Sequence, residues 1–174
     1  MNAPQVREMT LADCDRVAEI RVGGRQWAYR GLMPQAHLDA MSPSEDAERH
    51  RTRFRQARPG VLNLVAEQEG ETVGWLCHGP CRDGEVPPGS AELYAIYVDP
   101  VRSGAGVGQA LLGESIRRCS AAGHARMYLW VLRDNARARR FYERSGFRAD
   151  GVEEPYEVAG VAVPEVRYVR ELTG

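Results

Sequence analysis

The chain has 174 residues, of which 27% are charged and 43% hydrophobic, and its formal net charge is −1. This length is typical of one domain, and the near-neutral charge gives no electrostatic reason to expect nucleic acid or an anionic membrane as a partner. All 23 basic residues are arginine, which excludes chemistry that needs a lysine, such as a Schiff base.

The N-terminal segment and the cysteine spacing bear on the expected location and on metal binding. No stretch near the N-terminus has the length and apolar character of a signal peptide, and no segment is apolar enough to span a bilayer, so a cytoplasmic location is expected. Cys77, His78 and Cys81 are spaced like metal ligands, but no second pair completes a zinc site. We therefore expect no metal.

The first third of the chain predicts a short strand and two helices. Residues 6–9 favour the strand, and Thr10 and Asp13 have the spacing of a capping box at the start of the first helix. The glycine pair at 23–24 predicts a break in that helix. Residues 43–57 are highly charged and predict a solvent-exposed helix.

The middle of the chain predicts a hairpin followed by a central strand and a helix. Residues 61–67 and 72–79 favour two strands joined by a Glu-Gly turn. Residues 91–98, AELYAIYV, are apolar and predict the central strand. Apolar residues then recur at helical spacing from Val107, and Gly123 is typical of a helix end.

The last third predicts a strand, a helix and two further strands. Residues 126–132 favour the strand, and Asp134 or Asn135 caps the helix, which Gly146 ends. A long loop is predicted between the two final strands. This order of elements over residues 1–174 predicts a single α/β (α+β) domain, with helices on both faces of a mixed sheet.

A glycine-rich segment lies between the central strand and the helix that follows it. Gly104, Gly106 and Gly108 alternate there, at the point where a helix exposes unpaired backbone N–H groups. An anion such as a phosphate binds at such a place. The segment lacks the lysine of a P-loop and the third glycine of a dinucleotide fingerprint. A tight turn with no ligand is the alternative.

A second motif follows one strand later. Residues 130–147, WVLRDNARARRFYERSGF, place Asn135 at a helix start, Phe141 and Tyr142 on its inner face, and a Gly-Phe pair at its end. With the glycine segment, this stretch resembles the GNAT superfamily of N-acetyltransferases. The resemblance covers Glu92 to Phe147. It implies a mostly antiparallel sheet of about seven strands.

The resemblance also implies where acetyl-CoA binds. The sheet is expected to splay beside the central strand, and the pantetheine arm to pair with backbone there, as an added strand does. The expected cofactor residues are Ile96, Tyr97, Val98, Ser103, Gly104, Ala105, Gly106, Val107, Gly108, Asn135 and Phe141. Ser103 stands where the family usually has arginine or glutamine. The candidates for the outer phosphate are Arg102, Arg137, Arg139 and Arg140.

Acetyl transfer to an amine predicts two catalytic residues. Tyr142 is expected to protonate the departing thiolate, because a tyrosine hydroxyl stays protonated at neutral pH. Glu92 is expected to remove the amine proton through water. A core tyrosine and a solvated acid at a strand end are the alternatives. The attack is direct, so no cysteine nucleophile is needed.

The acceptor is expected outside the two motifs. Trp27, Tyr29 and Tyr94 are the candidate acceptor-binding residues, with packing against the sheet as the alternative. The expected acceptor is a primary amine of a small molecule or peptide, and a homodimer is left open. An acyl-CoA sensor without turnover, or transfer of a longer acyl chain, are the competing functions.

Overall fold

The computed structural model describes residues 2–172, and seven strands form one sheet in the order β1-β2-β3-β4-β5-β7-β6. Neighbouring strands are antiparallel except β4 and β5, which are parallel. This confirms the predicted fold class. The strands are β1 (Gln5–Glu8), β2 (Leu62–Gln68), β3 (Glu71–Pro80), β4 (Ala91–Val98), β5 (Arg126–Leu132), β6 (Arg148–Val158) and β7 (Val161–Glu171).

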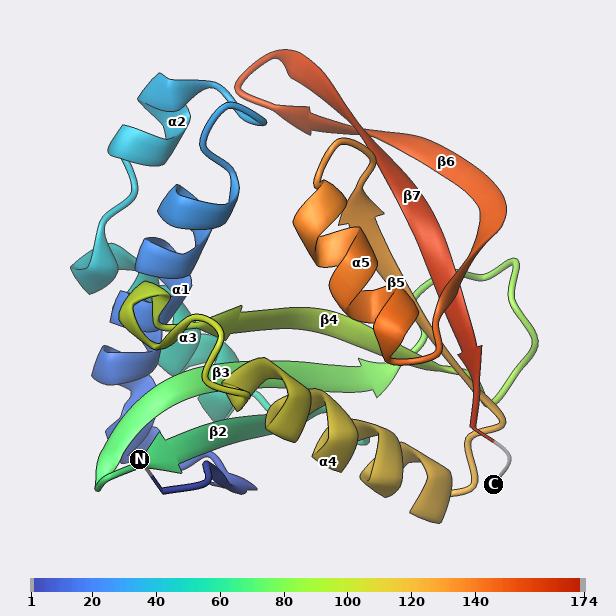
Figure 1. The fold of residues 1–174 in the computed structure, drawn as a ribbon, viewed down its shortest axis with the longest axis horizontal. Coiled ribbons are helices and arrows are strands. Elements are labelled where there is room, and N and C mark those ends of the chain that lie inside the picture. Colours follow the sequence, from blue (N-terminus) through green and yellow to red (C-terminus); the bar gives the residue numbers. More distant parts are fainter. Residues whose placement is uncertain (1, 173–174) are drawn as a thin grey trace.

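Helices cover both faces of the sheet (Figure 1). On one face α1 packs against β3, β4 and α3, and on the other α4 packs against β2, β3 and β4. The small helix α2 follows α1, and α5 follows β5. The helices are α1 (Cys14–Ala28), α2 (Gln35–Asp39), α3 (Pro43–Arg55), α4 (Val107–Ala121) and α5 (Ala136–Arg144).

The largest apolar cluster lies on the α4 and α5 face of the sheet. Leu111 and Leu112 of α4 are buried there against strand residues such as Leu76, and Phe141 and Tyr142 of α5 pack at its margin. An added Cβ at Gly74 of β3 would lie only 2.7 Å from Val107. Glycine at that position therefore allows α4 to sit close to the sheet, which fixes the start of α4 beside β4.

The predicted helix break at residues 23–24 is wrong, because α1 continues through both glycines to Ala28. The structure gives the reason for one of them. A Cβ added at Gly24 would lie 3.1 Å from the Tyr97 side chain of β4. Gly24 thus serves the close approach of a helix to a strand 73 positions later in the chain, a contact that a local pattern does not contain.

The predicted long loop between the last two strands is also wrong. β6 extends to Val158 and β7 begins at Val161, so only Ala159 and Gly160 connect them. Both have positive φ, as a two-residue type I′ turn requires. Pro155 lies within β6, which is an edge strand of the sheet, where proline is tolerated.

The charged segment forms α3 as predicted, with Ser42 as its N-cap, but it is only partly solvent-exposed. Asp46 and His50 are buried against α1 and the sheet. Asp46 accepts a hydrogen bond of 2.9 Å from Nε of Arg21, and the Arg21 guanidinium lies 4.5 Å from the ring centre of Trp75. This buried ion pair joins α1 to α3.

None of the helices within residues 2–172 is both long and apolar enough to cross a membrane. The metal-like spacing around residue 78 gives a different arrangement, since the His78 ring is buried and its Nδ1 lies 2.6 Å from the Ser115 hydroxyl of α4.

Candidate active site

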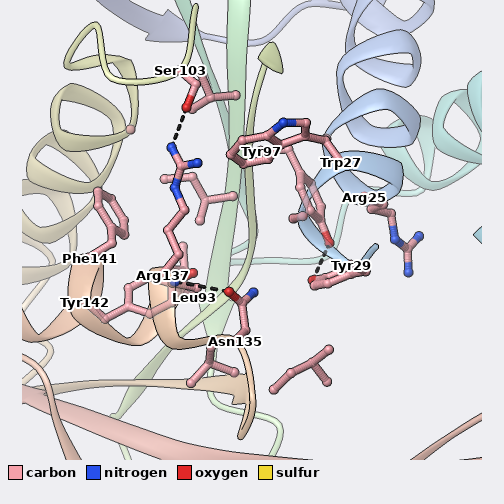
Figure 2. Close-up of a pocket in the computed structure, with 18 of the residues that line it drawn as sticks. Arg25, Trp27, Tyr29, Leu93, Tyr97, Ser103, Asn135, Arg137, Phe141 and Tyr142 are labelled. Carbon is pink, nitrogen blue, oxygen red and sulfur yellow. Dashed lines mark hydrogen bonds between the residues drawn. The ribbon is translucent and has the colours of Figure 1, made fainter. Parts of the chain in front are cut away.

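β4 and β5 diverge soon after they meet. Their backbone pairing covers only Ala91–Leu93 of β4, and a bulge follows at Tyr94. On its other edge β4 stays paired with β3 as far as Val98. Residues 94–98 therefore present to the β5 side an edge that β5 does not pair. A cleft of about 760 Å³ opens along this edge. Figure 2 shows residues that line it.

The glycine segment forms one end of the cleft. Asp99 caps a short 3-10 turn after β4, and Gly106 is the N-cap of α4 with a φ of 81°. Gly104 also has positive φ, which most residues avoid. An added Cβ at either glycine would meet no described atom within 4 Å. The first amides of α4 thus border open space that an anion can enter.

Arg137 of α5 reaches across the cleft to this glycine segment. Its guanidinium donates a hydrogen bond to the Ser103 hydroxyl and lies 4.2 Å from the ring centre of Trp27 on α1 (Figure 2). An arginine from α5 therefore stands beside the serine that replaces the family's usual basic or amide residue.

The other arginines predicted for the outer phosphate divide into two groups. Arg102 lines the cleft as Arg137 does. Arg139 instead donates to the Tyr168 hydroxyl and to the carbonyl of Arg133. Neither Arg139 nor the exposed Arg140 is among the described residues that line the cleft.

The N-terminal half of the second motif forms the cap of α5. The Asn135 side chain accepts a hydrogen bond from the Ala138 amide at 3.2 Å, so Asn135 rather than Asp134 is the cap. Asn135 also lines the cleft, opposite α1 (Figure 2). Phe141 lies close to Gly108, where an added Cβ would be 3.3 Å from its ring. α5 and the start of α4 are thereby held together.

Tyr142 of α5 lines the cleft beside Phe141. Its ring packs edge-on against Phe141 and Phe147, with centroid separations of 5.3 and 6.0 Å. Burial, followed by the nearby Tyr97, raises the pKa of the Tyr142 hydroxyl above its usual value, so the group stays protonated at neutral pH. Within the described part of the chain, no hydrogen bond joins this hydroxyl to another residue. It can therefore donate into the cleft.

The end of α1 forms the opposite wall (Figure 2). Trp27 is 45% exposed, and the Tyr29 hydroxyl shares a hydrogen bond of 3.1 Å with that of Tyr97. Burial raises the pKa of Tyr29 well above its usual value, and Tyr97 adds to the effect. Tyr94 donates to the Pro80 carbonyl, and the Arg82 guanidinium lies 4.1 Å from its ring centre.

Glu92 is not the solvated acid that its strand-end position suggested as an alternative. It is only 3% exposed, and its carboxylate accepts hydrogen bonds from the Arg82 amide at 3.0 Å and from Arg82 Nη2 at 2.6 Å. Glu92 therefore borders the cleft with its carboxylate already paired with Arg82.

Most of the residues predicted for the site do line one cleft. They are Trp27, Tyr29, Glu92, Tyr94, Ile96, Tyr97, Val98, Ser103, Gly104, Gly106, Val107, Gly108, Asn135, Phe141 and Tyr142. Ala105 packs against the main apolar cluster instead. Arg25 and Glu165 also line the cleft, and neither was predicted from the sequence. An arginine in a helix and an acid in a strand gave no local signal, because only the fold brings them to the cleft.

The sequence matches the acetyltransferase (GNAT) family over residues 29–147. The chain belongs to the GNAT family of acetyltransferases. This confirms the resemblance drawn from the two motifs and the prediction that the protein is an acyltransferase.

Relatives of this GNAT acetyltransferase differ in how much of the chain they share. YuaI, an uncharacterized N-acetyltransferase of Bacillus subtilis strain 168, is 29% identical over 92% of this chain and 89% of its own. A mycothiol acetyltransferase of Clavibacter michiganensis is 35% identical, but over 58% of this chain and 31% of its own. The fold matches PaiA N-acetyltransferase of Thermoplasma acidophilum, solved with coenzyme A, with a TM-score of 0.76, 18% identity and coverage of 98% and 99%.

Proposed function

We propose that this protein is an acetyl-CoA-dependent N-acetyltransferase that acts directly on a primary amine, and that residues 1–174 form one such domain. The proposal depends most on one observation: an unbonded Tyr142 hydroxyl lies in the cleft whose outer end is the glycine segment at the start of α4. That arrangement supplies an anion site and a proton donor within one cleft.

The residues present fit coenzyme A. The side-chain-free space at Gly104 and Gly106 suits the diphosphate, with the α4 amides as donors and Arg137 as a nearby cation. The edge of β4 at residues 96–98 suits the amide groups of a pantetheine arm, because β5 does not pair with it. Arg137 would exchange its contact with Ser103 for a phosphate oxygen.

When bound, acetyl-CoA supplies the acetyl group as a thioester, whose C–S bond breaks as the bond to the amine nitrogen forms. Each site residue then has a role in our proposal. The backbone amide near Val98 stabilises the negative charge on the carbonyl oxygen. The Tyr142 hydroxyl gives its proton to the departing sulfur, so that a thiol leaves.

The proton of the attacking amine needs an acceptor. Glu92 stays the sequence-based candidate, but its carboxylate is bound to Arg82, and that pair would have to open. Glu165 of β7 lines the same cleft, and its carboxylate makes no hydrogen bond or ion pair with another described residue. Burial, then Glu154 and Glu92, raises the pKa of Glu165. A carboxylate with a raised pKa is a better proton acceptor, so Glu165 joins Glu92 as a candidate base.

A test of the function is turnover of acetyl-CoA with a broad panel of amines, measured by release of the coenzyme A thiol. We expect thiol release that depends on an amine, with the acetylated amine as the second product. Coenzyme A binding without turnover on the whole panel would instead support the sensor function. An acyl-CoA series of increasing chain length, run on the accepted amine, tests whether acetyl is the preferred group.

A further inference from the structure

Arg25 is the one partly buried arginine without a partner in the described part of the chain. It lies in the last turn of α1 and lines the cleft beside Tyr29 (Figure 2). Its Nε is buried and has no hydrogen-bond partner. The other described arginines that lack a hydrogen bond or ion pair are all exposed, namely Arg30, Arg53, Arg55, Arg58, Arg140 and Arg148.

The position of Arg25 at a helix end explains its charge there but not its buried, unpaired Nε. A cation near a helix C-terminus is favoured by the helix dipole. That interaction does not require a buried Nε, and a buried donor with no acceptor is unfavourable. An anionic group in the cleft would remove this cost, because a guanidinium and a carboxylate match as two parallel hydrogen bonds.

The other cations of the cleft already have partners. Arg82 pairs with Glu92 at 2.6 Å, and Arg102 lies 3.6 Å from both Glu69 and Glu71. Arg137 contacts Ser103, next to the glycine segment, and Trp27. Arg144 donates to a backbone carbonyl of its own helix. Arg25, on the wall formed by the end of α1, is therefore the cleft arginine available to bind an anionic group of the acceptor.

The cleft also holds an unpaired acid. Glu165 of β7 is half-buried and stands opposite Leu132 of β5 in the sheet. Its carboxylate has no hydrogen-bond or ion-pair partner among the described residues. Glu154 lies beside it on β6. A cleft with one unpaired guanidinium and one unpaired carboxylate complements a molecule that carries both charges.

We propose that the acceptor amine is an amino acid, whose carboxylate binds Arg25 while its ammonium group is drawn towards Glu165. This inference rests on the proposed acetyltransferase function. It makes Arg25 a specificity-determining residue that holds the acceptor and takes no part in proton transfer. It also excludes amines without a nearby carboxylate, such as the N-terminus of a protein, as the preferred acceptors.

The test compares each amino acid with its own amide. The common L-amino acids and β-alanine are each assayed beside the corresponding amide, with kcat and KM measured separately. The carboxylate stabilises the ammonium form of the amine, so chemistry without a binding site favours the amide. We expect the opposite order for this protein. A wild-type preference for the amides would overturn the proposal.

Substitutions at Arg25 test whether this residue causes the preference for amino acids over their amides. Arg25→Gln should raise KM for the accepted amino acid by about tenfold, the effect of losing one charged hydrogen-bonded contact, and leave KM for the amide unchanged. The KM of Arg25→Lys for the amino acid should lie between those of the wild type and Arg25→Gln. Arg30→Gln, an exposed position just beyond the same helix, is the matched control and should change neither. Equal effects on the acid and the amide would contradict a carboxylate contact.

A binding measurement separates this inference from the proposed function. If no amine is acetylated, the proposed function fails, and each amino acid is titrated calorimetrically into protein saturated with coenzyme A. Binding to wild type that Arg25→Gln abolishes would support the carboxylate site even then. No amino-acid binding, or binding that Arg25→Gln leaves intact, would overturn the site. Thermal unfolding of each variant verifies that it is folded.

Discussion

Replacing Tyr142 with phenylalanine is expected to lower kcat for acetyl transfer by about a hundredfold, at the lower end of what a positioned proton donor contributes. The ring and its packing against Phe141 and Phe147 remain, so the cleft keeps its shape. Only the hydroxyl that protonates the leaving thiolate is lost. Steady-state kinetics on the accepted amine, with calorimetry for coenzyme A, measures both quantities. The Kd for coenzyme A should stay close to the wild-type value.

A matched control distinguishes catalysis from stability. Tyr128→Phe removes the same hydroxyl from a buried tyrosine of β5 that does not line the cleft. Its kcat should equal that of the wild type. An unchanged kcat in Tyr142→Phe would remove Tyr142 from the chemistry. Equal losses in the two variants would assign the effect to packing.

The largest expected change in stability comes from Asp46→Ala. This substitution leaves the Arg21 guanidinium buried without the carboxylate that now accepts its Nε hydrogen at 2.9 Å. Breaking a buried pair in this way costs about 3–5 kcal/mol, since one charge stays desolvated and unpaired. The free energy of unfolding at pH 7, from urea or guanidinium titration, measures it. Because α1 carries Arg25 and ends next to Tyr29, acceptor binding should weaken when α1 is no longer held on α3.

Two further variants test the cause. Glu45→Ala removes an exposed acid from the same turn of α3, so it should cost less than about 1 kcal/mol. Replacing both partners, as Arg21→Met with Asp46→Leu, should recover most of the loss, because no charge is then left buried. A loss below about 1 kcal/mol for Asp46→Ala alone would show that the pair does not hold α1 on α3.

Local patterns in the sequence were sufficient for most of the fold. The capping box at Thr10, the Ser42 cap and the glycine helix ends each mark a boundary that the structure contains. The failures involve contacts between distant residues. Gly24 lies within α1 because the Tyr97 side chain leaves little room for a Cβ there. β6 continues through Pro155 because it is an edge strand.

In the candidate site, too, local motifs were predictable from the sequence and contacts between distant residues were not. The two motifs predicted the glycine segment and the start of α5, because each is a continuous stretch with its own signature. Arg25, Glu165 and the Arg82 partner of Glu92 come from a helix, a late strand and a loop that share no motif. Their importance depends on which charges remain unpaired after folding, and a sequence pattern does not contain that information.

Calorimetric titration of coenzyme A into the wild-type protein and into Gly106→Ala tests the central claim most directly. We predict saturable binding of one molecule per chain to the wild type, weakened about tenfold by the alanine. Its Cβ would occupy the space left for the diphosphate, and a side chain at a φ of 81° favours relaxation of the free protein away from the bound conformation by about 1–2 kcal/mol. Gly113→Ala, at an exposed glycine within α4, should bind as the wild type does. No heat of binding, or equal affinity in all three proteins, would contradict the account.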